Sequence, residues 1–160
     1  MSLDELSTIL WRERELLETL LYRLETEELI LANGRARWVG RSSREVEAVL
    51  DQIRTTDLGR AVESDDAARE VGVPEGSSLL ELANAAPAPW DEMLRAHHTA
   101  LADITSQIST LSKLNRDLLA SSIQATQEAL LGIKDSMNTY TSQGSRSKGT
   151  DAAYLLDEAL

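Results

Sequence analysis

The sequence predicts an all-α protein: an elongated up-down helical bundle or antiparallel coiled coil with one very long C-terminal helix. Aromatic residues make up only 4% of the 160 residues and phenylalanine is absent, whereas sheets are rich in aromatic and β-branched side chains. Long stretches contain no proline, the strongest helix breaker. Along them, apolar residues recur at alternating spacings of three and four, which is typical of amphipathic helices.

The first predicted helix covers about residues 3–33 and contains no Gly or Pro before its end. Its apolar stripe is broad, but Glu13 and Glu27 interrupt it. Asn33 and Gly34 tolerate the left-handed conformation that closes a helix. The stripe consists of Leu3, Leu6, Leu10, Leu17, Leu20, Leu24 and Leu31.

The second predicted helix covers about residues 43–71, with Ser42 or Ser43 as its N-cap. We expect it to fray or bend near Gly59, because glycine weakens a helix interior. Its expected apolar face is Val46, Val49, Leu50, Ile53, Leu58 and Val62. The connection before it is rich in arginine, which either offsets the negative end of the first helix or contacts a phosphate or an acidic partner. These arginines are Arg35, Arg37, Arg41 and Arg44.

A short helix is predicted over residues 78–86, and Pro87 and Pro89 then introduce the longest helix, over residues 89–140. Its apolar series includes His97 and Asn115, and it continues from Leu119 one residue out of phase, as a four-residue stutter would produce. Only long partners can cover such a helix, so we expect the first two helices to lie against it. Residues 1–140 then form one helical domain. Residues 141–160 form a flexible tail, rich in Ser, Gly and Thr, with a short amphipathic patch from Tyr154 to Leu160.

The composition excludes several classes of function. Without cysteine there is no disulfide, Cys-ligated zinc or thiol nucleophile. The net charge of -11 disfavours nucleic acids and anionic membranes. There is no Gly-rich phosphate loop, and the adjacent His97 and His98 point about 100° apart on a helix, so they cannot chelate one ion well. We therefore predict no enzyme activity, cofactor or metal site.

The amino terminus lacks the basic region of a secretory signal, and no apolar run approaches the roughly 20 residues that span a bilayer. We therefore expect a cytoplasmic protein that does not insert into membranes. What remains for function is the long apolar stripe of the last helix. It is either sealed within a monomeric or homodimeric coiled coil or left open to receive an amphipathic helix from another protein.

Segments along nearly the whole chain resemble the FlgN family of flagellar export chaperones, especially the versions from high-GC Gram-positive bacteria. The resemblance lies in LWRERELL at residues 10–17, VEAVLDQI at 46–53, APAPW at 86–90, NRDLL at 115–119, and TYT at 139–141 with Gly144. It implies a cytoplasmic chaperone that binds hook-filament junction proteins and delivers them to the gate and ATPase components of the flagellar type III export apparatus. By the same resemblance, cargo contacts map to the latter part of the long helix, with Tyr140 as the docking aromatic for the gate. The mapped cargo contacts are Leu114, Leu118, Leu119, Ile123, Leu130 and Ile133.

Two other interpretations compete with this one. Trp38-Val39-Gly40 and the Tyr154 to Glu158 spacing resemble the WXG100 type of secreted helical hairpin. The chain is longer than that family, however, and its third long helix has no place in a two-helix hairpin. A purely structural homodimeric coiled coil is the third interpretation.

Overall fold

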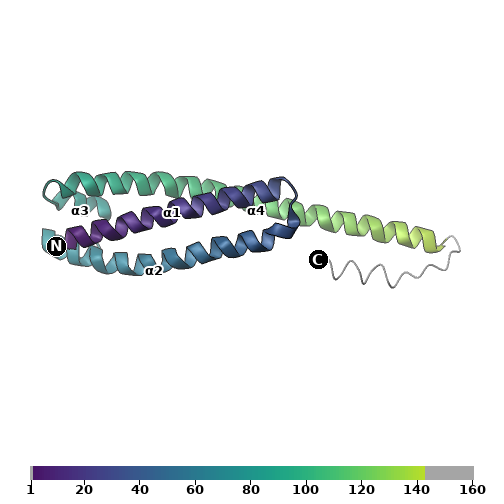
Figure 1. Cartoon of the computed structure of the whole chain (residues 1–160), viewed down its shortest axis with the longest axis horizontal. Helices are drawn as coiled ribbons and strands as arrows, with labels where there is room; N and C mark the ends of the chain where they lie inside the picture. Colours follow the sequence, from purple (N-terminus) through teal and green to yellow (C-terminus); the bar gives the residue numbers. More distant parts are fainter. Residues whose placement is uncertain (1, 143–160) are drawn as a thin grey trace. The chain divides into compact units, whose positions relative to one another are not determined.

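The computed structural model describes residues 2–142, and their side chains through Thr139. The elements are α1 (Ser2–Ala32), a short 3₁₀ turn η1 (Ala36–Trp38), α2 (Val39–Val71), α3 (Leu79–Ala85) and α4 (Trp90–Ser142), as Figure 1 shows. Residues 2–142 contain no strand. The predicted all-α bundle with a very long C-terminal helix is therefore confirmed. The chain divides into two units, and the boundary between Leu118 and Leu119 falls within α4.

In the first unit, α2 runs antiparallel to α1 and the start of α4 runs parallel to it. Glu13 and Arg23 of α1 pair with Arg60 and Glu45 of α2, so residue numbers rise on one helix as they fall on the other. By contrast, Ser7 lies 3.4 Å from His97 and the Leu24 carbonyl accepts a hydrogen bond from Asn115, so α1 and α4 advance together. The helix order is therefore up, down, up.

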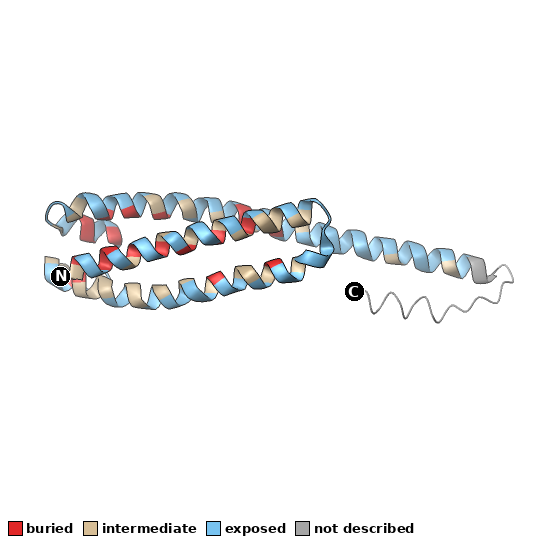
Figure 2. Ribbon diagram, in the orientation of Figure 1, coloured by how far each residue is buried: buried red, intermediate tan, exposed pale blue. Residues whose placement is uncertain are grey.

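The core of the first unit consists of two hydrophobic clusters separated by a polar layer. Figure 2 shows the buried positions following α1 along its length. One cluster gathers Leu3, Leu6, Leu10, Ala67, Ala68, Leu79, Leu82, Ala83, Leu94 and Leu101. The other gathers Leu20, Leu24, Val49 and Leu111. Between them lies Glu13, which is 6% exposed and accepts two hydrogen bonds from Arg60 at 2.8 and 2.9 Å.

Both polar interruptions predicted in the α1 stripe have polar partners across the bundle. Glu13 pairs with Arg60, and Glu27 accepts a hydrogen bond of 3.2 Å from Asn115. Asn115 is 3% exposed and also donates to the Leu24 carbonyl at 2.9 Å. A buried asparagine in a helical seam fixes the register of the two helices, since a shift would leave its amide without partners.

The predicted N-cap of the second helix is wrong. The helix begins at Val39 rather than near residue 43, its N-cap is Trp38 without a side-chain hydrogen bond, and Ser42 lies inside it, 3% exposed. The physical reason is the turn η1, which leads directly into the helix. Its backbone bonds, including Trp38 N–H to the Arg35 carbonyl at 3.0 Å, replace a serine cap. By contrast, Ser78 forms a full capping box with Glu81 at the start of α3.

The predicted apolar face of the second helix is wrong beyond Ile53. Leu58 and Val62 are 74% and 59% exposed. The helix is continuous through Gly59, and there the inward positions are the polar or small residues Gly59 and Arg60. A Cβ added at Gly59 would lie 2.8 Å from Ile9 Cδ1, so glycine at this position allows α1 and α2 to approach closely.

The burial of His97 predicts that the stability of the first unit depends on pH. It is 2% exposed, its Nδ1 is buried without a partner among the described residues, and its ring meets Trp11 edge-on at 4.8 Å. Burial lowers the pKa of His97 below its usual 6.5, and the charge of Arg14 lowers it further. The unfolded chain therefore binds more protons than the folded chain as the pH falls through about 6.5. The stability contributed by the neutral imidazole is lost in that window.

We expect the free energy of unfolding to fall between about pH 7.5 and about pH 5.5, and a His97→Gln variant to show a smaller fall. Urea unfolding followed by circular dichroism at the two pH values measures this. His98→Gln is the matched control, because His98 is exposed on the same helix. An equal fall in the free energy of unfolding for wild type and His97→Gln would contradict the assignment of this pH dependence to His97.

Candidate partner-binding surface

The second unit presents an apolar line along α4, which we call the α4 stripe: Leu119, Ile123, Leu130 and Ile133. Leu119, Ile123 and Ile133 are 38%, 50% and 43% exposed, and Leu130 is half-buried. No residue from 119 to 139 is buried. In the first unit, by contrast, α4 buries Leu94, His97, Leu101, Leu111 and Asn115. Figure 2 shows this change along α4.

The α4 stripe is narrow. At about 100° per residue, its four members fall within roughly 80° of the helix circumference. Leu131 is 61% exposed but lies about 100° from Leu130 around the helix, outside this sector. A sector this narrow resembles the seam of a coiled coil, where one partner helix packs along the line.

The structure separates the residues predicted as cargo contacts. Leu119, Ile123, Leu130 and Ile133 belong to the second unit and share one face of α4. Leu114 and Leu118 belong to the first unit. Leu114 is 41% exposed and lines a hollow between α1 and α4, and Leu118 is half-buried. Tyr140 lies within α4, but its side chain is outside the described residues, as is the patch from Tyr154 to Leu160.

The structure also contains a groove between α1 and α4 that sequence reasoning missed. Two hollows of about 330 and 260 Å³ share Leu21 and Gln107. Their linings come entirely from α1 and α4, and we call them together the α1–α4 groove. The α1 side of the lining is Arg14, Glu18, Leu21, Glu25 and Glu28, and the α4 side is Ala100, Asp103, Ile104, Ser106, Gln107, Thr110, Leu111 and Leu114. Glu18, Glu25 and Glu28 were visible in the sequence as an acidic series on one helix. The sequence did not show that this series borders a groove, because that depends on which helix lies beside it.

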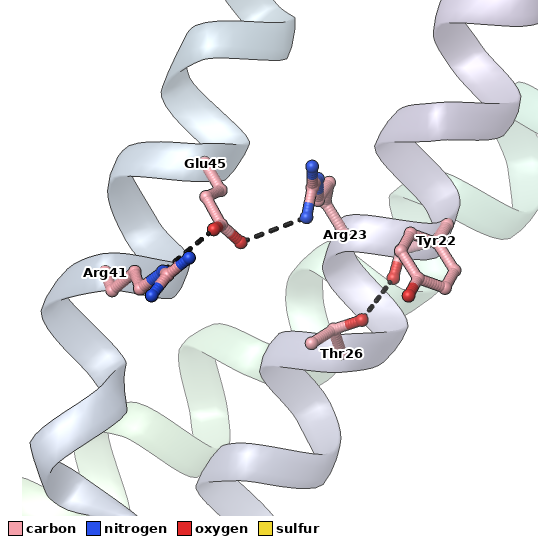
Figure 3. Close-up of polar contacts among 5 residues, drawn as sticks. All are labelled: Tyr22, Arg23, Thr26, Arg41 and Glu45. Carbon is pink, nitrogen blue, oxygen red and sulfur yellow. Dashed lines mark hydrogen bonds and ion pairs between the residues drawn. The ribbon is translucent and has the colours of Figure 1, made fainter.

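Part of the arginine-rich connection has an intramolecular role. Figure 3 shows Glu45 between two guanidinium groups: Arg41 Nε and Arg23 Nη1 each lie 3.1 Å from one of its carboxylate oxygens. Arg37 lies over the Trp38 ring, 4.9 Å from its centroid. The Arg23–Glu45 contact joins α1 to α2, and the Arg41 and Arg37 contacts stabilise the start of α2 and the turn before it. They favour the structural interpretation for Arg37 and Arg41.

Among residues 2–142, no group of three His, Cys, Asp or Glu side chains is arranged to hold a metal ion. In the same range, none of the helices combines the length and apolar character that crossing a membrane requires.

Within residues 2–139, the helical bundle leaves an apolar face of α4 uncovered, as is typical of proteins that bind other proteins. A family model described as FlgN protein matches residues 1–148 of the chain. The chain therefore belongs to the FlgN family, and it is a flagellar export chaperone that binds flagellar proteins. The family consists of chaperones and is not known for enzymatic activity. No curated protein and no solved structure matches the chain.

Proposed function

We propose that this chaperone binds hook-filament junction proteins in the cytoplasm and delivers them to the flagellar type III export apparatus. The cargo segment is an amphipathic terminal helix of the junction protein, and it packs along the α4 stripe. Tyr140, near the C-terminal end of α4, docks on the export gate. The observation that supports the proposal is the absence of any buried residue from 119 to 139 of α4.

The chemistry of the α4 stripe suits a client that must later be released. Leucine and isoleucine side chains bind through burial, at about 25 cal/mol per Å² of apolar area. A client segment that is unfolded before binding loses conformational entropy when it forms a helix, and this offsets part of the gain. The resulting affinity is moderate, which allows transfer to the export apparatus.

The sequence of the stripe region adds a second argument. Residues 119–139 contain Ser121, Ser122, Thr126, Gly132 and Ser136, which are weaker helix formers than alanine or leucine. Most helix stability in proteins comes from packing of an apolar face rather than from propensity. A client helix along the stripe supplies that packing, so binding stabilises both helices together.

The direct test mixes the purified full chain with a purified junction protein from the same organism and measures binding by isothermal titration calorimetry. We expect a 1:1 complex of micromolar or tighter affinity, and no binding when the amphipathic terminal segments of the junction protein are deleted. Equal binding by the truncated client would refute the proposed cargo segment. No binding by the intact client would refute the proposed client.

Two further measurements separate the alternatives. Light scattering of the free chain gives its mass: a stable homodimer that loses client binding would favour the structural coiled coil. Detection of the protein in the culture medium rather than the cell fraction would favour the secreted interpretation.

A further inference from the structure

The α1–α4 groove lies wholly in the first unit and is separate from the α4 stripe. Its lining follows helical spacings of three and four on both helices, including positions 14, 18, 21, 25 and 28 on α1 and 100, 103, 107, 110 and 114 on α4. Because the two helices are parallel, the rims stay level with each other along the groove. At about 1.5 Å per residue the groove is roughly 20 Å long, which matches a helix of about 14 residues.

The groove combines an apolar floor with acidic rims. Leu21, Ile104 and Leu111 contribute the apolar surface, and Leu114 closes one end. Four carboxylates border this surface, and Arg14 is the one positive charge in the lining. The carboxylates are Glu18, Glu25, Glu28 and Asp103.

The bundle leaves the groove side of α1 and α4 open. The α1 residues that meet α2 are a different set, including Ile9, Glu13 and Arg23. The lining of both hollows comes from α1 and α4, with no residue of α2 or α3 in it. The groove is therefore formed by α1 and α4 alone.

We propose that the α1–α4 groove binds a cationic amphipathic helix of a partner protein. The apolar side chains of that helix pack on Leu21, Ile104 and Leu111, and its Lys or Arg side chains pair with the rim carboxylates. Charge selects this occupant over two others. A second copy of the chain carries a net charge of -11, and the last ten residues of the chain, 151–160, carry Asp151, Asp157 and Glu158 and no Lys or Arg. The proposal does not depend on what the α4 stripe binds.

The test uses the full chain and two synthetic 14-residue helical peptides with the same leucine face, one flanked by lysines and the other by glutamates. Fluorescence anisotropy of a labelled peptide gives the affinity. We expect the lysine peptide to bind and the glutamate peptide not to bind. Glu25→Gln with Glu28→Gln is expected to weaken binding of the lysine peptide about tenfold, because the variant removes two surface ion pairs.

A matched variant and a blocking variant locate the peptide. Glu47→Gln with Glu70→Gln removes the same charge from exposed α2 positions outside the groove, and we expect less than a twofold change. Gln107→Trp fills the point where the two hollows meet and is expected to abolish binding without changing helicity. Equal weakening by the two charge variants would overturn the proposal, because it would show non-specific attraction. Loss of binding in a variant of the α4 stripe would also overturn it, and so would failure of the lysine peptide to bind.

Discussion

Replacing Ile123 and Ile133 with aspartate is expected to abolish client binding and leave the first unit folded. The two residues are 50% and 43% exposed in the free chain, so a charge there stays in water and costs the free protein little. In the proposed complex the exposed half of each isoleucine is buried, which contributes half of the roughly 1.5–3 kcal/mol that full burial of such a side chain provides. Two losses, together with the cost of burying carboxylates, correspond to a weakening of at least about a hundredfold.

Calorimetric titration of the junction protein measures this effect, and circular dichroism checks the fold. Leu131→Asp is the matched control. It introduces the same charge on the same helix at a more exposed leucine, 61% exposed, outside the α4 stripe. We expect its affinity to stay within about threefold of wild type, since surface substitutions away from a contact change energies by about 0.5 kcal/mol. If Leu131→Asp weakened binding as much as the double variant, the stripe would not be the contact surface.

Replacing Arg60 with alanine is expected to lower the free energy of unfolding by about 3–5 kcal/mol. Glu13 is 6% exposed and holds its charge through two hydrogen bonds from the Arg60 guanidinium. Removing one partner of a buried pair leaves an uncompensated charge, which is far more costly than the pair itself. Urea denaturation at pH 7 measures the loss.

Two variants and a change of pH test this explanation. Arg54→Ala breaks an exposed pair with Asp51 and is expected to cost less than about 1 kcal/mol. Glu13→Leu with Arg60→Leu removes both charges and is expected to be near neutral or stabilising. Burial raises the pKa of Glu13 even with Arg60 present. Folding therefore favours the protonated acid, and the deficit of Arg60→Ala should shrink as the pH falls toward 4.5, the ordinary pKa of glutamate. A deficit that does not depend on pH would indicate lost packing rather than a stranded charge.

Periodicity predicted the inward faces of α1 and of the first-unit part of α4, because apolar residues there recur at spacings of three and four. Leu3, Leu6, Leu10, Leu20 and Leu24 are all buried, and so are the polar stripe positions His97 and Asn115. Hydrophobic periodicity could not predict the partners of the polar residues. That Glu13 meets Arg60, and Glu27 meets Asn115, follows from how far the helices slide past one another, which one chain segment does not encode by itself.

The failures lie in α2. Following apolar type along that helix selected Leu58 and Val62, whereas the spacing of three and four from Val49 and Ile53 leads to Arg60. The rule that inward-facing residues are apolar fails where a polar layer lies in the middle of a bundle. The α1–α4 groove was missed for a related reason. Each of its sides is an ordinary polar helix face in the sequence, and the groove exists only because α1 and α4 lie side by side.

One property of α4 bears on how a client leaves. Between 119 and 139 the charged residues are Glu128, Lys134 and Asp135. Dissolved ions screen attraction between charges and have little effect on contacts between hydrocarbon side chains. A complex formed on the α4 stripe is therefore expected to keep its strength across the range of physiological ionic strength. Under the proposed function, the client is then transferred when another apolar surface competes for it, rather than when the salt concentration changes.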